Sequence, residues 1–115
     1  MAIYRFGAPL FYANANRFSE EILRLVGPQP CQLRWLIIDS DAMTNIDYSA
    51  AKVVGELHRK LTERGVVLLF ARVHPALEED LERHQITETV GAEHIFPRLH
   101  DALAAYHRSG LGASS

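Results

Sequence analysis

The chain has 115 residues, a length typical of one domain with its own core. Apolar residues make up 48% and charged residues 23%, and the net charge of −2 excludes the polybasic surface of a nucleic-acid-binding protein. Cys31 is the only cysteine, so no internal disulfide can form and a reducing compartment is expected. No apolar run approaches the roughly 20 residues that cross a bilayer, so we expect a soluble, cytosolic chain that does not insert into the membrane.

The first quarter of the chain predicts two strands and a helix. Residues 3–6 and 10–13 are rich in aromatic and branched side chains, and "GAP" separates them, so we expect two short strands and one antiparallel sheet edge. Asn14 or Asn16 can cap the helix that follows. Gly27, with prolines directly after it, predicts where that helix ends.

The middle of the chain predicts a strand, a helix and a second strand. Residues 33–39 are mostly apolar with little alternation, the pattern of a strand that is covered on both faces. An amphipathic helix follows Asp47, and Gly65 ends it. Residues 66–73, "VVLLFARV", predict another buried strand.

The last third of the chain predicts two helices and a short strand. Pro75 suits the first position of a helix whose thin apolar face reaches Ile86. Residues 95–96 then predict a short last strand, and residues 99–108 predict a final helix. Residues 110–115 are expected to form a disordered tail.

These elements follow one another in the order β-β-α-β-α-β-α-β-α. Strands that alternate with helices require crossover connections, and such connections produce a largely parallel sheet flanked by helices. We therefore expect a single α/β domain over residues 1–109. Its sheet should be mixed but mostly parallel, with about five strands flanked by about four helices.

Residues 39–50, "DSDAMTNIDYSA", lie where ligand sites form in open α/β sheets, between the end of a strand and the start of a helix. Asp47 is the expected cap of the helix, and Ser49 then points to solvent near the positive end of the helix dipole. A phosphate on Ser49 would be favoured by the dipole and opposed by the charge of Asp47. The alternative is that both residues only start the helix.

Other kinds of chemistry have less support in the sequence. Asp39 and Asp41 could suggest a metal-binding or phosphoryl-accepting site, but the first strand offers no further acid to hold Mg²⁺. The six histidines show no zinc-type spacing, so no metal is expected. Ser49 is not in a G-x-S-x-G turn, which argues against a hydrolase. Because no glycine-rich phosphate loop occurs, a nucleotide would depend on helix amino ends alone.

Three stretches of the sequence together resemble a known family. They are "IYRFGAPLFYANANRF", "LIIDSDAMTNIDYSAAKVVGELHRKLTERGVVLLFARV" and "IFPRLHDALA". They are similar to a STAS domain, above all to the C-terminal cytosolic STAS domain of sulfate permease (SulP) family anion transporters. The likeness runs from residue 3 to about residue 106. Its most specific part is the opening pattern R-x-x-A-P-L-F-x-A-N.

The resemblance also implies which residues carry regulation. In the anti-sigma factor antagonists of this family, a partner kinase phosphorylates the serine of a D-x-S segment, and Ser49 falls on that position. Tyr48 replaces a small residue of the pattern, and Ala50 replaces a glycine. The implied regulatory loop consists of Thr44, Asn45, Asp47 and Tyr48, with Ser49 as the possible phosphoacceptor. A weak GTP or ATP site would use Asp39, Ser40, Asp41 and Ser49, and no other cofactor is expected.

The resemblance implies a non-catalytic regulatory and protein-interaction domain at the cytoplasmic face of the inner or plasma membrane, within a larger anion transporter. Its expected partners are the transmembrane domain of that transporter, another STAS domain or a soluble regulatory protein. The alternative is a stand-alone anti-sigma factor antagonist that is switched by phosphorylation of Ser49. An enzyme would need a convergent pocket of titrating groups, and the spacing of this sequence assembles none.

Overall fold

The computed structural model describes residues 1–27 and 35–108. These ranges contain three strands, five α-helices and one short 3₁₀ helix. In chain order the elements are β1 (Ala2–Arg5), α1 (Tyr12–Val26), β2 (Trp35–Asp39), α2 (Tyr48–Glu63), β3 (Val67–Ala71), α3 (Pro75–Arg83), α4 (Ile86–Val90), η1 (Ala92–His94) and α5 (Leu99–Arg108). The predicted tail at residues 110–115 and the predicted start of the second strand at residues 33–34 lie outside the described ranges.

The sheet has the order β1-β2-β3, and both of its strand pairs are parallel. The expected count of about five strands is therefore wrong for the described residues, and so is the antiparallel edge. Of the two missing strands, residues 10–13 contribute only a bridge between Leu10 and Ile46. The other, at residues 95–96, contributes only a bridge between Phe70 and Ile95. Ile95 thus bridges to β3 itself, whereas Leu10 bridges to the loop before α2, and neither bridge extends the ladder.

Helix α1 begins earlier than its asparagines suggested. Phe11 is extended and Tyr12 is the first helical residue. Asn14 lies inside the first turn, where its Oδ1 accepts a hydrogen bond of 2.9 Å from the N–H of Phe11. This bond satisfies a backbone donor that precedes the helix, as the third-position residue of a capping box does. The asparagine thus stabilises the start of α1 from within, and residues 10–13 cannot be a strand.

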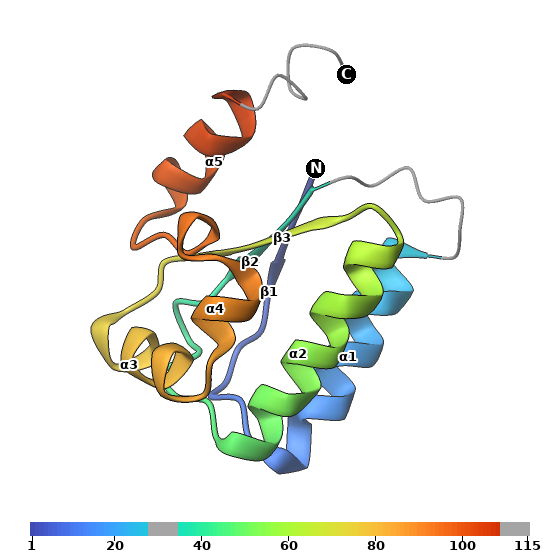
Figure 1. The fold of residues 1–115 in the computed structure, drawn as a ribbon, viewed down its shortest axis with the longest axis vertical. Coiled ribbons are helices and arrows are strands. Elements are labelled where there is room, and N and C mark those ends of the chain that lie inside the picture. Colours follow the sequence, from blue (N-terminus) through green and yellow to red (C-terminus); the bar gives the residue numbers. More distant parts are fainter. Residues whose placement is uncertain (28–34, 109–115) are drawn as a thin grey trace.

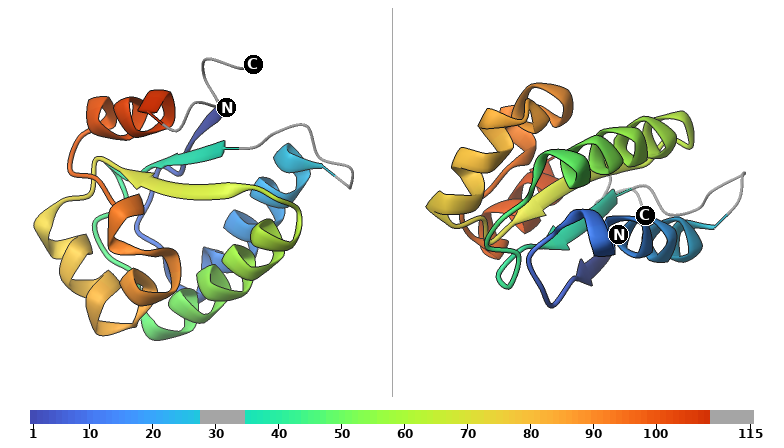
Figure 2. Two further views of the ribbon diagram at one scale, coloured as in Figure 1. Left: turned by 45° about the horizontal axis from the view of Figure 1, so that its top comes forward. Right: turned by 90° about the horizontal axis from the view of Figure 1, so that it is seen from below.

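The elements form three layers (Figures 1 and 2). Helices α1 and α2 run side by side over one face of the sheet, together with α3 and α4, and α5 covers the opposite face. Every residue of β2 is buried, which confirms the prediction of a strand covered on both faces. Leu36 and Ile38 belong to the core under α1 and α2, whereas Trp35 and Ile37 belong to the core under α5.

The expected third helix is divided in two. Gln85 adopts a left-handed conformation with φ of 64° between α3 and α4, and this conformation stops the helical path. The break turns the chain so that Ile86 still reaches the core, as its periodicity predicted. Helix ends at Gly27 and just before Gly65 were predicted correctly, and both glycines have positive φ angles.

Candidate functional site

Asp47 caps two helices at once. Its Oδ1 accepts a hydrogen bond of 2.7 Å from the N–H of Ala50 in the first turn of α2, as predicted. Its Oδ2 accepts one of 3.0 Å from the N–H of Tyr12, the first residue of α1. Because the first N–H groups of a helix have no partner within it, one carboxylate satisfies a donor from each helix. The starts of α1 and α2 are thereby held together (Figure 1).

The backbone just before Asp47 is fixed from two further directions. Leu10 donates to the carbonyl of Asn45 at 2.9 Å and accepts from the N–H of Asp47 at 3.2 Å. The N–H of Ile46 donates to Oδ2 of Asp80 at 3.1 Å. Asp80 is itself buried and ion-paired to Arg83 at 2.8 Å, so this buried carboxylate is fully engaged. The loop therefore presents its side chains from a rigid frame.

The side chains that this frame presents are exposed. Thr44, Asn45, Tyr48 and Ser49 all face solvent, and Ser49 is the second residue of α2. Tyr48 is 61% exposed, yet its ring has neighbours on two sides. The ammonium of Lys52 lies 4.9 Å from its centroid, and the imidazole of His84 meets it edge-on. The hydroxyl of Ser49 is thus accessible beside an ordered aromatic ring.

A second polar group lies at the carboxyl ends of β2 and β3. Arg72 Nη1 lies 3.4 Å from Oδ2 of Asp39, and its Nη2 lies 3.3 Å from Oδ2 of Asp41. His74 Nε2 lies 2.9 Å from Oδ1 of Asp41. The hydrogen bond with His74 is the main cause that lowers the pKa of Asp41. Desolvation opposes this shift, and the nearby Arg72 guanidinium adds a weaker lowering effect. Asp41 is therefore held ionised.

Arg72 reaches these carboxylates from an unusual backbone conformation, with φ of 58°. A residue with a β-carbon is strained there, so the surrounding contacts must hold it. The guanidinium of Arg72 already neutralises part of the negative charge of Asp39 and Asp41, so these carboxylates would attract a metal ion only weakly. Within residues 1–27 and 35–108, no three His, Cys, Asp or Glu side chains converge in a way that could hold a metal.

The residues predicted for a nucleotide site have different surroundings. Ser40 is completely buried, and its hydroxyl donates to the carbonyl of Ile38 at 3.3 Å. Asp39 is 7% exposed and accepts from the N–H of Asp41. Ser49 lies apart from these three along the chain, at the exposed start of α2. The structure joins Asp39, Ser40 and Asp41 in one turn, and nucleotide binding by the four residues stays a prediction.

Three residues of this region were not anticipated from the sequence: Arg72, His74 and Asp80. A signal for the first two was present, because both follow a buried strand at the sheet edge where Asp39 and Asp41 were expected. Nothing in the sequence pointed to Asp80, since its partner Ile46 is 34 residues away and the bond is to a backbone N–H.

Residues 1–102 match the STAS domain family, and the chain belongs to that family. It is 32% identical over 108 residues to a probable sulfate transporter of Mycobacterium tuberculosis, an alignment that covers 94% of this chain and 19% of that protein. It is 30% identical over 114 residues to high affinity sulfate transporter 2 of Stylosanthes hamata, with 92% and 17% covered. The chain thus spans about a fifth of the length of these transporters.

Solved structures give the same assignment. A sulfate transporter family protein from Wolinella succinogenes superposes with a TM-score of 0.78 at 26% identity, covering 90% of this chain and 82% of that one. The SulP transporter STAS domain from Vibrio cholerae has a TM-score of 0.75 at 21% identity, with 94% and 81% covered, which shows the shared fold. The predicted resemblance to SulP-type STAS domains is therefore confirmed. No helix in the described ranges is both long and apolar enough to span a membrane.

Proposed function

We propose that the chain is a cytosolic regulatory and protein-interaction domain of a SulP-type sulfate or other anion transporter, without catalysis of its own. It would lie at the cytoplasmic face of the inner or plasma membrane, joined to a transmembrane domain. The support is its similarity, over nearly all of its length, to about a fifth of each sulfate transporter named above. Its partners in this role would be the transmembrane domain of that transporter, another STAS domain or a soluble regulatory protein.

The regulatory surface in this proposal consists of Thr44, Asn45, Asp47, Tyr48 and Ser49. The observation that carries it is the double cap, which fixes the loop through Asp47 while it leaves the hydroxyl of Ser49 exposed. A phosphate on Ser49 would bring about two negative charges and strong acceptor oxygens close to the N–H groups that Asp47 now binds. Competition for those donors would alter the surface that a partner contacts.

Phosphorylation can be tested on the chain itself. The wild type and a Ser49→Ala variant are incubated with ATP and a lysate of the source cells, and phosphopeptides are located by mass spectrometry. We expect phosphate on Ser49 in the wild type and none in that peptide of the variant. Phosphate found only at another residue would refute the assignment of Ser49.

Weak binding of GTP or ATP near Asp39, Ser40, Asp41 and Ser49 is part of the same proposal. The Arg72 guanidinium beside Asp39 and Asp41 is a cation that a nucleotide phosphate could meet. Amide chemical shifts recorded during a GTP titration test this site. If residues 39–50 do not shift at millimolar nucleotide, the chain has no such site.

The parent protein can be identified from its size in the cell. An antibody raised against the chain reports the mass and the fractionation of the native antigen. We expect a membrane-bound species several times larger than 115 residues. A soluble species of this size would refute the transporter and support the alternative, a stand-alone anti-sigma factor antagonist with an exposed phosphoacceptor.

A further inference from the structure

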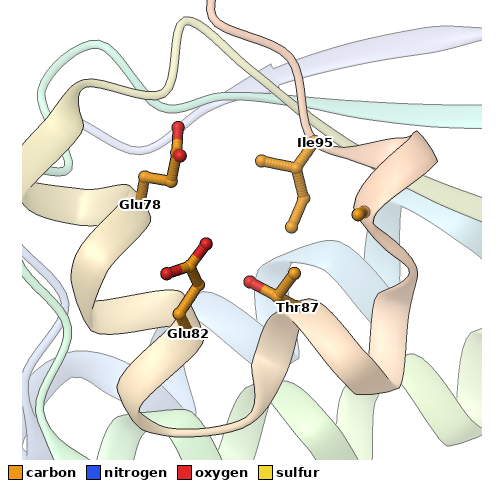
Figure 3. A pocket seen from close by; sticks show the side chains of 5 residues that line it. Glu78, Glu82, Thr87 and Ile95 are labelled. Carbon is orange, nitrogen blue, oxygen red and sulfur yellow. The ribbon is translucent and has the colours of Figure 1, made fainter.

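A small cavity of about 120 Å³ lies between α3 and the chain that follows it. It is lined by Glu78, Glu82, Thr87, Ala92 and Ile95, and we name it the acidic pocket. Figure 3 shows the two carboxylates and the hydroxyl of Thr87 directed into one space, with Ile95 across from them. The glutamates are one helical turn apart on α3, which places them on the same face.

The polar groups of the acidic pocket lack partners within the described ranges. Neither Glu78 nor Glu82 forms an ion pair or a side-chain hydrogen bond there, whereas Asp80 on the same helix binds Arg83. The hydroxyl oxygen of Thr87 is buried and also has no hydrogen-bond partner. Because buried polar groups in folded proteins are nearly always paired, this hydroxyl can take a partner that enters the acidic pocket.

The chemistry of the lining favours a cation on an apolar stem. Two carboxylates and one hydroxyl offer three acceptor groups, and an ammonium group carries three donors. Ala92 and Ile95 supply the apolar wall against which the methylene groups of a lysine side chain would lie. A calcium ion would need six to eight oxygen ligands, more than the acidic pocket provides.

The charge around the acidic pocket matches such a partner. Residues 75–94 hold six of the chain's acidic residues and only one arginine, although the net charge of the whole chain is −2. Cytosolic loops of membrane proteins carry an excess of lysine and arginine. We propose that the acidic pocket binds a lysine side chain from a cytosolic loop of the transporter's own membrane domain. This inference rests on the proposed function, because that function supplies the loop.

A peptide titration tests the inference on the 115-residue chain. The probe is a synthetic peptide of eight residues with three lysines, and its control carries glutamine in place of each lysine. Amide chemical shifts should change at Glu78, Glu82, Thr87 and Ile95 with the lysine peptide alone. Glu78→Gln with Glu82→Gln should weaken binding by about tenfold, and Thr87→Val should weaken it by less.

The matched control is Glu79→Gln with Glu88→Gln, which removes the same charge from exposed positions of α3 and α4 outside the acidic pocket. Equal weakening by both pairs would mean attraction to a negative surface and would overturn the acidic pocket as the site. Shifts that avoid the pocket would overturn it as well. If the antibody experiment instead finds a small, soluble native antigen, the proposed function is overturned. The loop that would supply the lysine is then lost as well, even if the peptide binds.

Discussion

At the scale of single residues, the carboxylate of Asp47 joins the starts of α1 and α2. Its bond with Tyr12 connects residues that are 35 positions apart in the chain. Each cap is worth about 1 kcal/mol, so Asp47→Ala should lower the free energy of unfolding by about 2 kcal/mol. Urea unfolding measures this change. Ser49→Ala is the control, because Ser49 is exposed and caps neither helix. A loss for Asp47→Ala no larger than that for Ser49→Ala would contradict the double cap.

His58 and His94 line one largely apolar cavity of about 410 Å³ between α2, β3 and α4. Burial, and to a lesser degree His94, lower the pKa of His58 below its usual value. The folded state therefore disfavours the proton on His58. The contribution of neutral His58 to stability is complete above the unfolded pKa of about 6.5, and it is lost as the pH falls towards the folded pKa.

Replacing His58 should therefore flatten the dependence of stability on pH. Urea unfolding at pH 7.5 and pH 5.5 measures the difference for the wild type, for His58→Gln and for His107→Gln. We expect the wild type and His107→Gln to lose more stability on acidification than His58→Gln does, since His107 is exposed. If all three lose the same amount, His58 does not resist protonation in the fold.

At the scale of elements, Gln85 separates α3 from α4 with φ of 64°, and Arg72 follows β3 with φ of 58°. A glycine adopts such angles without steric cost, so Gln85→Gly should raise the free energy of unfolding by about 0.5–1 kcal/mol. Arg72→Gly relieves similar strain but removes the ion pairs to Asp39 and Asp41. We expect the gain only for Gln85→Gly, and thermal unfolding of both variants checks this difference.

The apolar pattern of the sequence predicted the elements that are defined by short stretches of the chain. Strands β2 and β3, the ends of α1 and α2 and the cap at Asp47 all followed from apolar runs and capping residues. Residues 10–13 have strand-like composition, but Phe11 donates a hydrogen bond to Asn14 and the chain is helical from Tyr12 onwards. The break at Gln85 was missed because it depends on a left-handed glutamine, which no pattern signals.

The candidate site was predictable only in part, because some of its hydrogen bonds join distant parts of the chain. Its local members, Asp47 and Ser49, have a capping signature within four residues. The bonds from Asp47 to Tyr12 and from Asp80 to Ile46 join residues more than 30 positions apart. Such contacts depend on how the helices pack, and a single sequence shows no sign of them.

At the scale of the whole molecule, α5 is the one helix among residues 1–27 and 35–108 that covers the second face of the sheet. Trp35 lies under it, 7% exposed, with its ring 5.2 Å from that of Tyr106. A chain that ends at residue 98 should therefore expose Trp35, shift its fluorescence to longer wavelength and bind a hydrophobic dye. Trp35 is the only tryptophan, so the emission reports this face alone.

The control for this truncation is a chain that ends at residue 109, the predicted boundary of the domain. Its emission should equal that of the full chain if residues 110–115 are the tail that the sequence predicts. A red shift already at that length would move the boundary of the domain towards residue 115.

The parallel sheet also has a consequence for how the chain is made. Residues 2–5 of β1 pair with residues 36–39 of β2, and β2 in turn pairs with residues 67–71. Neither pair can close through a short turn, because parallel strands need a crossover between them. On the ribosome, β1 emerges before β2, and the chain that contains α1 must be made before the first ladder can form. Folding speed should thus depend on how soon α1 and α2 meet.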